Sequence, residues 1–317
     1  MKAKRAVPLA CLSLVVTALQ ATGQSQPVPA PEEARAVSFH APALGRELNY
    51  LVALPADYES AKDRRYPVLY LLHGRGDNMR AWTRIVPDLR RLAAEGRIPP
   101  VIAIMPDADS SRRAGYYVDS RFTGSPTPPL PAGEAMETAL TRDLIAHVDA
   151  TYRTREGRTG RIVAGYSMGG YGALRFSLAH PELFAAAIVL SPAVYVPLPP
   201  RDSSTREFGA FGRDAQVFDD GVYTALNYPA LLAGVEAKGL PLAMFIGVGD
   251  DEAAHPDPSE AVHDLDYEAH RLYNRMRRVP GVRAELRVID GGHNWKVWQP
   301  LLLEGLVWLL ARPNLDS

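Results

Sequence analysis

Short apolar segments alternate with amphipathic ones along most of this sequence, and that alternation restricts the possible folds more than any other feature. Residues 47–54 alternate apolar and polar side chains, which predicts an antiparallel first strand. Further strands, most of them apolar runs typical of burial on both faces, are predicted at 67–72, 101–105, 161–164, 185–190, 242–248 and 282–289. Helical spacing of apolar residues follows at 140–152, 168–179, 267–278 and 301–310. The alternation predicts an α/β fold: a mostly parallel central sheet with helices on both faces. Ligands of such sheets bind at the carboxyl ends of the strands.

Composition narrows the range of partners. The chain has 317 residues, of which 47% are hydrophobic, and its net charge is -1. This apolar content suffices for one large core, and the near-zero charge gives no reason to expect nucleic acid or an anionic membrane as a partner. The single cysteine, Cys11, lies close to the N-terminus. We therefore expect neither disulfides nor a Cys-ligated zinc site, and we predict no metal.

The N-terminus is predicted to be a secretory signal covering residues 1–23. Basic residues at the start are followed by an apolar run at 6–19 that is short for a membrane span, and then by small residues. A retained N-terminal anchor is the alternative. Residues 24–33 are Pro-rich and predict a flexible leader, and 34–317 are expected to form a single catalytic domain with an insertion around 195–232. We expect a secreted or periplasmic protein with no stable membrane span in its mature chain.

A G-x-S-x-G pentapeptide supplies the candidate nucleophile, Ser167. A predicted strand leads into the segment GYSMG, and a predicted helix rich in small residues leads out of it. A sharp strand-to-helix turn lifts a serine hydroxyl clear of the sheet, and flanking glycines let the backbone pass closely. An ordinary glycine-rich turn is the alternative interpretation, but the context agrees with a nucleophilic serine.

A serine hydroxyl needs a base to take its proton, and His293 is the candidate. It follows the last predicted strand, where this order of motifs places the base. An acid that orients the histidine is expected after the preceding strand, where Asp250, Asp251 and Glu252 stand in a row. By position alone, all three remain candidates.

The oxyanion of an acyl-transfer intermediate needs two backbone N–H donors. One is predicted to come from Met168, directly after the nucleophile, and the other from the loop after the first buried strand. That loop reads HGRGD, and Arg75 is the candidate within it. A glycine-rich turn without this role is the alternative.

At these motifs the chain resembles the esterase D and enterochelin-esterase-like family of α/β hydrolases. The matching segments run in the family's order from about Tyr66 to Trp298; they are YPVLYLLHGRGD, GYSMGGYGAL, FIGVGDDE and VIDGGHNWKVW. The resemblance implies an α/β-hydrolase fold, a Ser–acid–His triad and no cofactor. It also favours Glu252 narrowly over Asp251, because the family usually places its acid three residues after a strand-ending glycine, here Gly249.

The resemblance implies hydrolysis of a carboxylic ester through an acyl-enzyme on Ser167. A small-molecule or carbohydrate ester is the expected substrate, such as an acetyl or feruloyl ester. The alternatives are acyl transfer of the mycolyltransferase type, peptide hydrolysis, and a non-catalytic carbohydrate-binding hydrolase scaffold. Aromatic residues of the insertion could contact a sugar or feruloyl ring, or could belong to its core; they are Tyr195, Phe208, Phe211, Phe218 and Tyr223.

Overall fold

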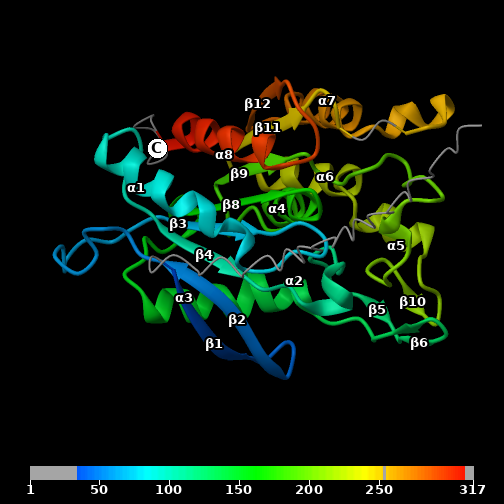
Figure 1. The fold of residues 1–317 in the computed structure, drawn as a ribbon, viewed down its shortest axis with the longest axis horizontal. Helices are drawn as coiled ribbons and strands as arrows, with labels where there is room; N and C mark the ends of the chain where they lie inside the picture. Colours follow the sequence, from blue (N-terminus) through cyan, green and yellow to red (C-terminus); the bar gives the residue numbers. More distant parts are fainter. Residues whose placement is uncertain (1–33, 253–254, 311–317) are drawn as a thin grey trace, which may run out of the picture.

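A sheet of eight strands organises the molecule (Figure 1). The structure is a computed structural model that describes residues 34–252 and 255–310. The strands are β1 (Arg35–Ala41), β2 (Arg46–Ala53), β3 (Val68–Leu72), β4 (Ile102–Pro106), β8 (Arg161–Tyr166), β9 (Ala186–Leu190), β11 (Leu242–Gly249) and β12 (Val282–Ile289). Their order is β1-β2-β4-β3-β8-β9-β11-β12. β2 pairs antiparallel with β1 and β4, and all other neighbours pair in parallel.

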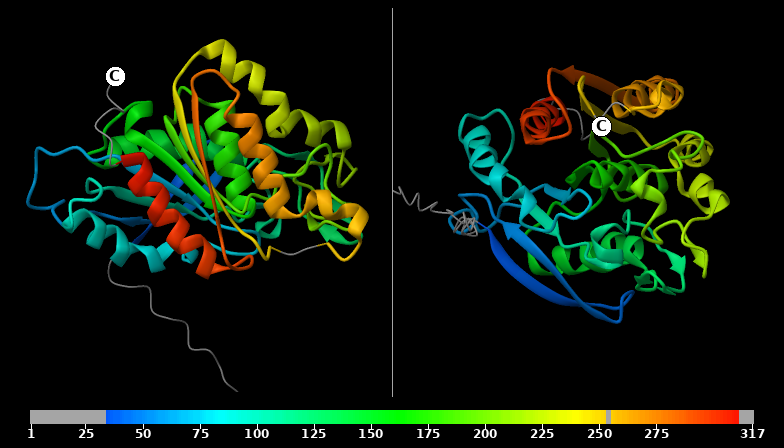
Figure 2. Two further views of the ribbon diagram at one scale, coloured as in Figure 1. Left: turned by 90° about the horizontal axis from the view of Figure 1, so that it is seen from above. Right: turned by 45° about the vertical axis from the view of Figure 1, so that its right-hand side comes forward.

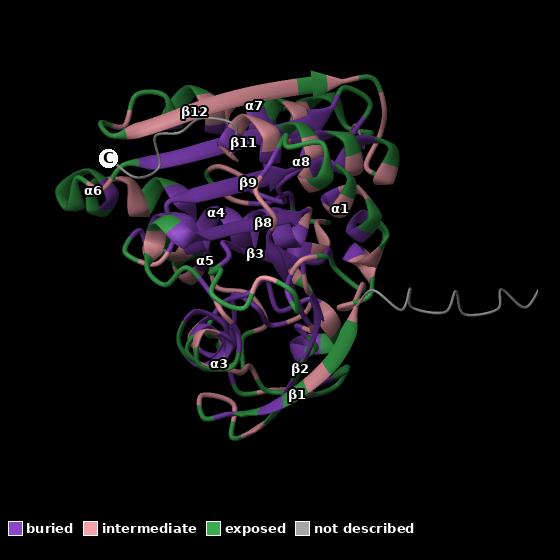
Figure 3. Ribbon diagram, turned by 90° about the vertical axis from the view of Figure 1, so that its left-hand side faces the viewer, coloured by how far each residue is buried: buried purple, intermediate pink, exposed green. Residues whose placement is uncertain are grey.

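Helices cover both faces of this sheet (Figure 2). They are α1 (Val86–Ala94), α2 (Met136–Thr138), α3 (Ile145–Thr151), α4 (Met168–Ala179), α5 (Asp220–Leu226), α6 (Tyr228–Lys238), α7 (Leu265–Met276) and α8 (Trp295–Leu310). Successive residues of β3 point to opposite faces: Leu69 and Leu71 join the core under α1 and α8, whereas Val68 and Tyr70 join the core under α3, α4 and α7. The central strands are therefore buried on both sides (Figure 3), which is why they read as apolar runs.

The structure confirms the predicted α/β fold, although several of its elements, α1, α5 and α6 among them, were not predicted. β1 was not predicted: as an edge strand it exposes most of its residues and carries little apolar pattern. α8 begins at Trp295, six residues before the predicted start, and includes Pro300. Burial of Val297 and Trp298 against the sheet accounts for this early start, since it outweighs the helix hydrogen bond that a proline cannot make.

The segment predicted as an insertion follows β9, and its buried aromatic side chains join the core under α4. Phe211 and Tyr223 are fully buried, with ring centroids 4.8 Å apart, so these two aromatics are core residues. α6 continues to Lys238, beyond the predicted limit of 232. Two-residue strands complete this region and its neighbourhood; they are β5 (Arg121–Phe122), β6 (Ser125–Pro126), β7 (Pro129–Leu130) and β10 (Arg213–Asp214).

The predicted signal and leader, residues 1–33, lie outside the described residues. In the described part of the chain, no helix is both long enough and apolar enough to cross a bilayer.

Candidate active site

Ser167 stands at the turn from β8 into α4 in a backbone conformation that few residues adopt. Its φ is 57° and its ψ is -121°, and a positive φ of this kind in a non-glycine residue is typical of functional turns. The turn is possible because of the glycines on either side. A Cβ on Gly165 would lie 2.1 Å from the Gly169 carbonyl oxygen, and one on Gly169 would lie 2.1 Å from the Leu72 carbonyl oxygen. Only glycine allows these approaches.

His293 lies next to Ser167, although the two are far apart in the sequence. Its Nε2 is 2.9 Å from Ser167 Oγ, and its Nδ1 is 2.6 Å from Glu252 Oε2. Glu252 follows β11 and His293 follows β12, so the adjacent carboxyl ends of parallel strands bring the three side chains together. The serine hydroxyl, the imidazole and the carboxylate thus form a continuous hydrogen-bonded line from the half-buried Ser167 to the buried Glu252.

The three successive acids after β11 have different surroundings. Glu252 is 2% exposed, and its Oε1 accepts the Gly249 N–H at 2.9 Å. Asp250 and Asp251 are exposed: the Asp250 carboxylate accepts the Gly291 N–H at 3.0 Å, and the backbone N–H of Asp251 donates to the Gly291 carbonyl oxygen at 3.0 Å. Their carboxylates gather with that of Asp290 at the surface. Of the three candidates, Glu252 is the acid that contacts His293.

The segments that carry the two candidate oxyanion donors follow β3 and β8, which are neighbours in the sheet. A Cβ on Gly169 would also lie 2.8 Å from the His73 carbonyl oxygen, so the loop after β3 abuts the first turn of α4. Met168 is the first residue of α4. The N–H of Tyr171, three residues later, donates to the Ser167 carbonyl oxygen. Among the described residues, the Arg75 backbone N–H has no hydrogen-bond acceptor, and the Arg75 side chain is exposed above Phe208. The loop that carries Arg75 is therefore packed against the first turn of α4, where Met168 lies.

The loop that carries Arg75 is held by residues that the sequence did not single out for this purpose. The Gly76 N–H donates to the Arg113 carbonyl oxygen at 3.0 Å, and the Tyr117 hydroxyl donates to the His73 carbonyl oxygen at 2.8 Å. The Tyr166 hydroxyl donates to the Asp77 carboxylate. These contacts join segments that are distant in the sequence, so no local sequence pattern predicts them.

His73 is a structural member of this loop. It is fully buried; its Nδ1 donates to the Gly74 carbonyl oxygen at 2.8 Å, and its Nε2 accepts the Ala108 N–H at 3.1 Å. Burial lowers the pKa of His73 below its ordinary value and keeps the ring neutral. A neutral ring is what this pair of contacts needs, since one nitrogen donates and the other accepts.

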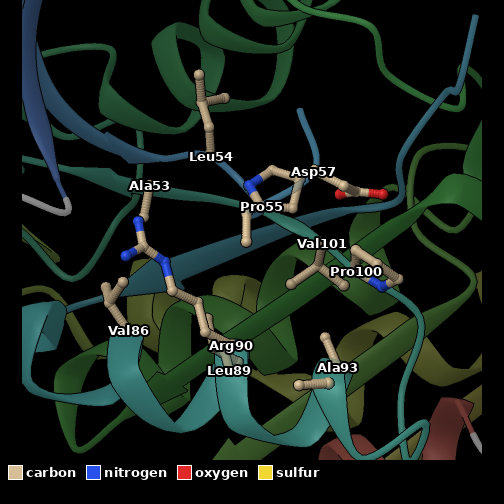
Figure 4. A pocket seen from close by; sticks show the side chains of 12 residues that line it. Ala53, Leu54, Pro55, Asp57, Val86, Leu89, Arg90, Ala93, Pro100 and Val101 are labelled. Carbon is tan, nitrogen blue, oxygen red and sulfur yellow. The ribbon is translucent and has the colours of Figure 1, made fainter. Parts of the chain in front are cut away.

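An apolar cavity of about 250 Å³ lies away from this site (Figure 4). Its walls come from the end of β2, the loop after it, α1 and the residues before β4, and they include Ala53, Leu89 and Val101. Ala53 pairs with Ala103 near the start of β4, so the cavity lies at the amino end of that strand. The candidate site lies at the opposite, carboxyl ends of the parallel strands, and the cavity is therefore not part of it.

The chain is similar in sequence and in fold to known esterases. The sequence model of a family described as putative esterase matches residues 41–309. An esterase of Mycobacterium tuberculosis is 36% identical over 151 residues, which are 47% of this chain and 30% of that protein, so the match spans less than a third of its length. An acetyl esterase of Caldicellulosiruptor saccharolyticus is 23% identical over 291 residues, 86% of this chain and 96% of that protein. The structure of a ferulic acid esterase superimposes with a TM-score of 0.67 and 26% identity, covering 88% of this chain and 97% of the other.

Proposed function

The chain belongs to the putative esterase family, and from that premise we propose that it hydrolyses carboxylic esters through an acyl-enzyme on Ser167. One observation carries the proposal: His293 contacts Ser167 Oγ with one ring nitrogen, at 2.9 Å, and the buried Glu252 with the other, at 2.6 Å. This arrangement suits a nucleophile, a general base and an acid that orients the base. Glu252 rather than Asp251 is the proposed acid.

The proposed reaction proceeds in two halves. His293 Nε2 takes the hydroxyl proton as Ser167 Oγ attacks the ester carbonyl carbon, and the N–H groups of Met168 and Arg75 stabilise the negative charge on the carbonyl oxygen. The imidazolium, stabilised by Glu252, then gives its proton to the leaving alcohol, and the acyl group stays on Ser167. A water molecule gives a proton to the same histidine and attacks the acyl-enzyme, which releases the carboxylic acid and restores the serine hydroxyl.

Acetyl and feruloyl esters attached to carbohydrate are the proposed substrates. This part of the proposal is supported by the names of two similar proteins, the acetyl esterase and the ferulic acid esterase. Export of the protein is also proposed, on the character of residues 1–23. Mass spectrometry of the exported protein tests this, because cleavage after Gly23 would leave Gln24 as the new N-terminus.

The test of the proposed chemistry replaces the nucleophile. The Ser167→Ala variant should lose turnover of a short-chain nitrophenyl ester and labelling by a fluorophosphonate probe, while the unchanged protein shows both. Ser177→Ala is a matched control, because Ser177 is a fully buried serine in α4 whose hydroxyl donates only to the Leu174 carbonyl oxygen. Turnover that persists in pure Ser167→Ala protein would refute the acyl-enzyme on Ser167. Transfer to an added sugar in preference to water would indicate an acyltransferase.

A further inference from the structure

We propose that Ser191 and Trp298 form a positioning pair behind Glu252. The pair sets which atom donates and which accepts in each hydrogen bond between Glu252 and Ser167. Ser191 follows β9 and Trp298 lies in α8. The inference rests on the proposed function, since it concerns how the line of Glu252, His293 and Ser167 is kept ready to react.

Both residues are buried and continue the hydrogen-bonded line beyond the acid. The Ser191 hydroxyl donates to Glu252 Oε1, and the Trp298 indole Nε1–H donates to Ser191 Oγ at 3.0 Å. Ser191 is fully buried and Trp298 is 7% exposed. The line therefore runs from Trp298 through Ser191, Glu252 and His293 to Ser167.

The proton positions along this line follow from the chemistry of its first member. An indole nitrogen can donate but cannot accept, so Ser191 Oγ must accept from Trp298. The hydroxyl has one hydrogen, and that hydrogen is left for Glu252 Oε1, which also accepts the Gly249 N–H. Glu252 Oε2 is then the only remaining oxygen of the carboxylate, and it faces His293.

This order of donors determines which nitrogen of the His293 imidazole carries the proton. Every contact made by Glu252 comes from a donor if Nδ1 of His293 carries a proton, and the ionised carboxylate is then satisfied at both oxygens although it is buried. With its proton on Nδ1, His293 has its lone pair on Nε2, the atom 2.9 Å from Ser167 Oγ. The pair thus selects the tautomer that can accept the proton of Ser167.

The backbone around Ser191 connects the acid to the nucleophile as well. The Leu190 carbonyl oxygen accepts the Ser167 N–H at 2.9 Å, and the Ala193 N–H donates to the Ser167 carbonyl oxygen at 3.1 Å. Ser191 itself has a φ of 40° and donates its N–H to the Gly247 carbonyl oxygen at 2.7 Å. The segment after β9 therefore holds the backbone of Ser167 and the carboxylate of Glu252 in one frame.

Ring packing fixes the indole. The Trp298 ring stacks on Tyr166 with centroids 4.2 Å apart and planes 19° apart, and it meets the His293 ring edge-on at 4.9 Å. Tyr166 directly precedes Ser167, so Trp298 packs against the neighbours of the nucleophile and against the base at once. Because the indole cannot swing away, its N–H remains aimed at Ser191.

The test removes each donor separately. Ser191→Ala removes the hydroxyl, and Ser191→Gly removes it while also relaxing the positive φ, so agreement between the two excludes a backbone cause. Trp298→Phe keeps an aromatic ring and removes only the N–H donor. Ser177→Ala and Trp308→Phe are the matched controls: one removes another buried serine hydroxyl, and the other changes a tryptophan of α8 that packs against Phe245.

We expect both Ser191 variants to lower kcat about 10- to 100-fold, since each loses a hydrogen bond to a charged group, and Trp298→Phe to lower it about 10-fold. KM for the nitrophenyl ester should change little, because the pair does not contact the substrate. The acidic limb of the kcat/KM profile should move to higher pH in the Ser191 variants, since a carboxylate with fewer donors holds the imidazolium more strongly. The downfield N–H proton resonance of His293 should shift in all three.

Unchanged pH profiles and an unchanged His293 resonance in folded Ser191→Ala and Ser191→Gly proteins would overturn the inference, whatever their stability. So would equal losses of kcat in the two control variants, because a general loss of packing would then explain the effect. Ser167→Ala in the same assay separates the two proposals: if it is inactive while the Ser191 and Trp298 variants behave as unchanged protein, the positioning pair is refuted and the acyl-enzyme on Ser167 stands.

Discussion

Replacing Glu252 by glutamine should test the assignment of the acid most directly, because the change alters charge and hydrogen bonding but hardly alters shape. Three donors point at the carboxylate: the Gly249 N–H, the Ser191 hydroxyl and the His293 ring. An amide offers one oxygen and one NH₂ group. Its oxygen satisfies Gly249 and Ser191, so its NH₂ faces His293 and requires a lone pair on Nδ1. The imidazole proton then moves to Nε2, toward Ser167, where it blocks general-base catalysis.

The size of the effect can be worked out from this geometry. The imidazolium of the transition state also loses its counter-charge, and unit charges ~4 Å apart attract by about 4 kcal/mol at an effective dielectric constant of about 20. Each 1.36 kcal/mol is about tenfold in rate, so the charge alone accounts for about 10³-fold. With the wrong tautomer added, we expect kcat of Glu252→Gln to fall by about 10³- to 10⁴-fold.

The assay is turnover of a nitrophenyl ester, with circular dichroism and thermal melting as checks of folding. Asp251→Asn is the matched control: it makes the same carboxylate-to-amide change one residue away, at an exposed position, whereas His293 Nδ1 is bonded to Glu252. This variant should leave kcat nearly unchanged. A folded Glu252→Gln protein that keeps a tenth or more of the activity would refute this reasoning. So would a large loss in Asp251→Asn.

Three further predictions concern the turn and the loop beside Ser167. Arg75→Ala should keep most of the activity because the proposed donor is a backbone N–H, whereas Arg75→Pro, which lacks that N–H, should lower kcat by about 10²- to 10³-fold in a folded protein; equal effects would contradict this. Gly169→Ala should lower the free energy of unfolding by roughly 1 to 3 kcal/mol in denaturant titration, because its Cβ would meet the Leu72 carbonyl oxygen; an unchanged midpoint would argue against that contact. The lowered pKa of buried His73 means that the unfolded chain binds its proton more readily, so His73 stabilises the fold above its ordinary pKa of 6.5 and this stabilisation is lost as the pH falls below that value. His73→Gln should therefore show a shallower loss of stability on acidification, and an equal slope in both proteins would refute the role of His73.

The sequence predicted the central strands well because they are buried on both faces. α4 and β12 begin and end where the residue pattern placed them. Prediction was poorer where neighbours decide the conformation. β1 depends on pairing with β2 at the edge of the sheet, and the first turns of α8 depend on burial of Trp298. Local spacing of apolar residues cannot report either effect.

The candidate site divides in the same way. Ser167 and His293 could be proposed from the sequence because a nucleophile at a strand-to-helix turn has a local signature, and because the order of motifs along the chain places the base after the last strand. Adjacent acids have no such signature, since Asp251 and Glu252 differ only in which way the chain turns after β11. The tertiary structure turns Glu252 inward against His293 and leaves Asp251 exposed.

Ser191 and Trp298 became visible only in three dimensions. Ser191 follows β9 and Trp298 lies in α8, and the proposed role depends on one hydrogen bond between them and one to Glu252. The sequence by itself determined the fold class and the candidate nucleophile and base, because these follow from periodicity and from short motifs. The tertiary structure decided which acid meets the base and what holds that acid, because those choices depend on directions of side chains that strands distant in the sequence bring together.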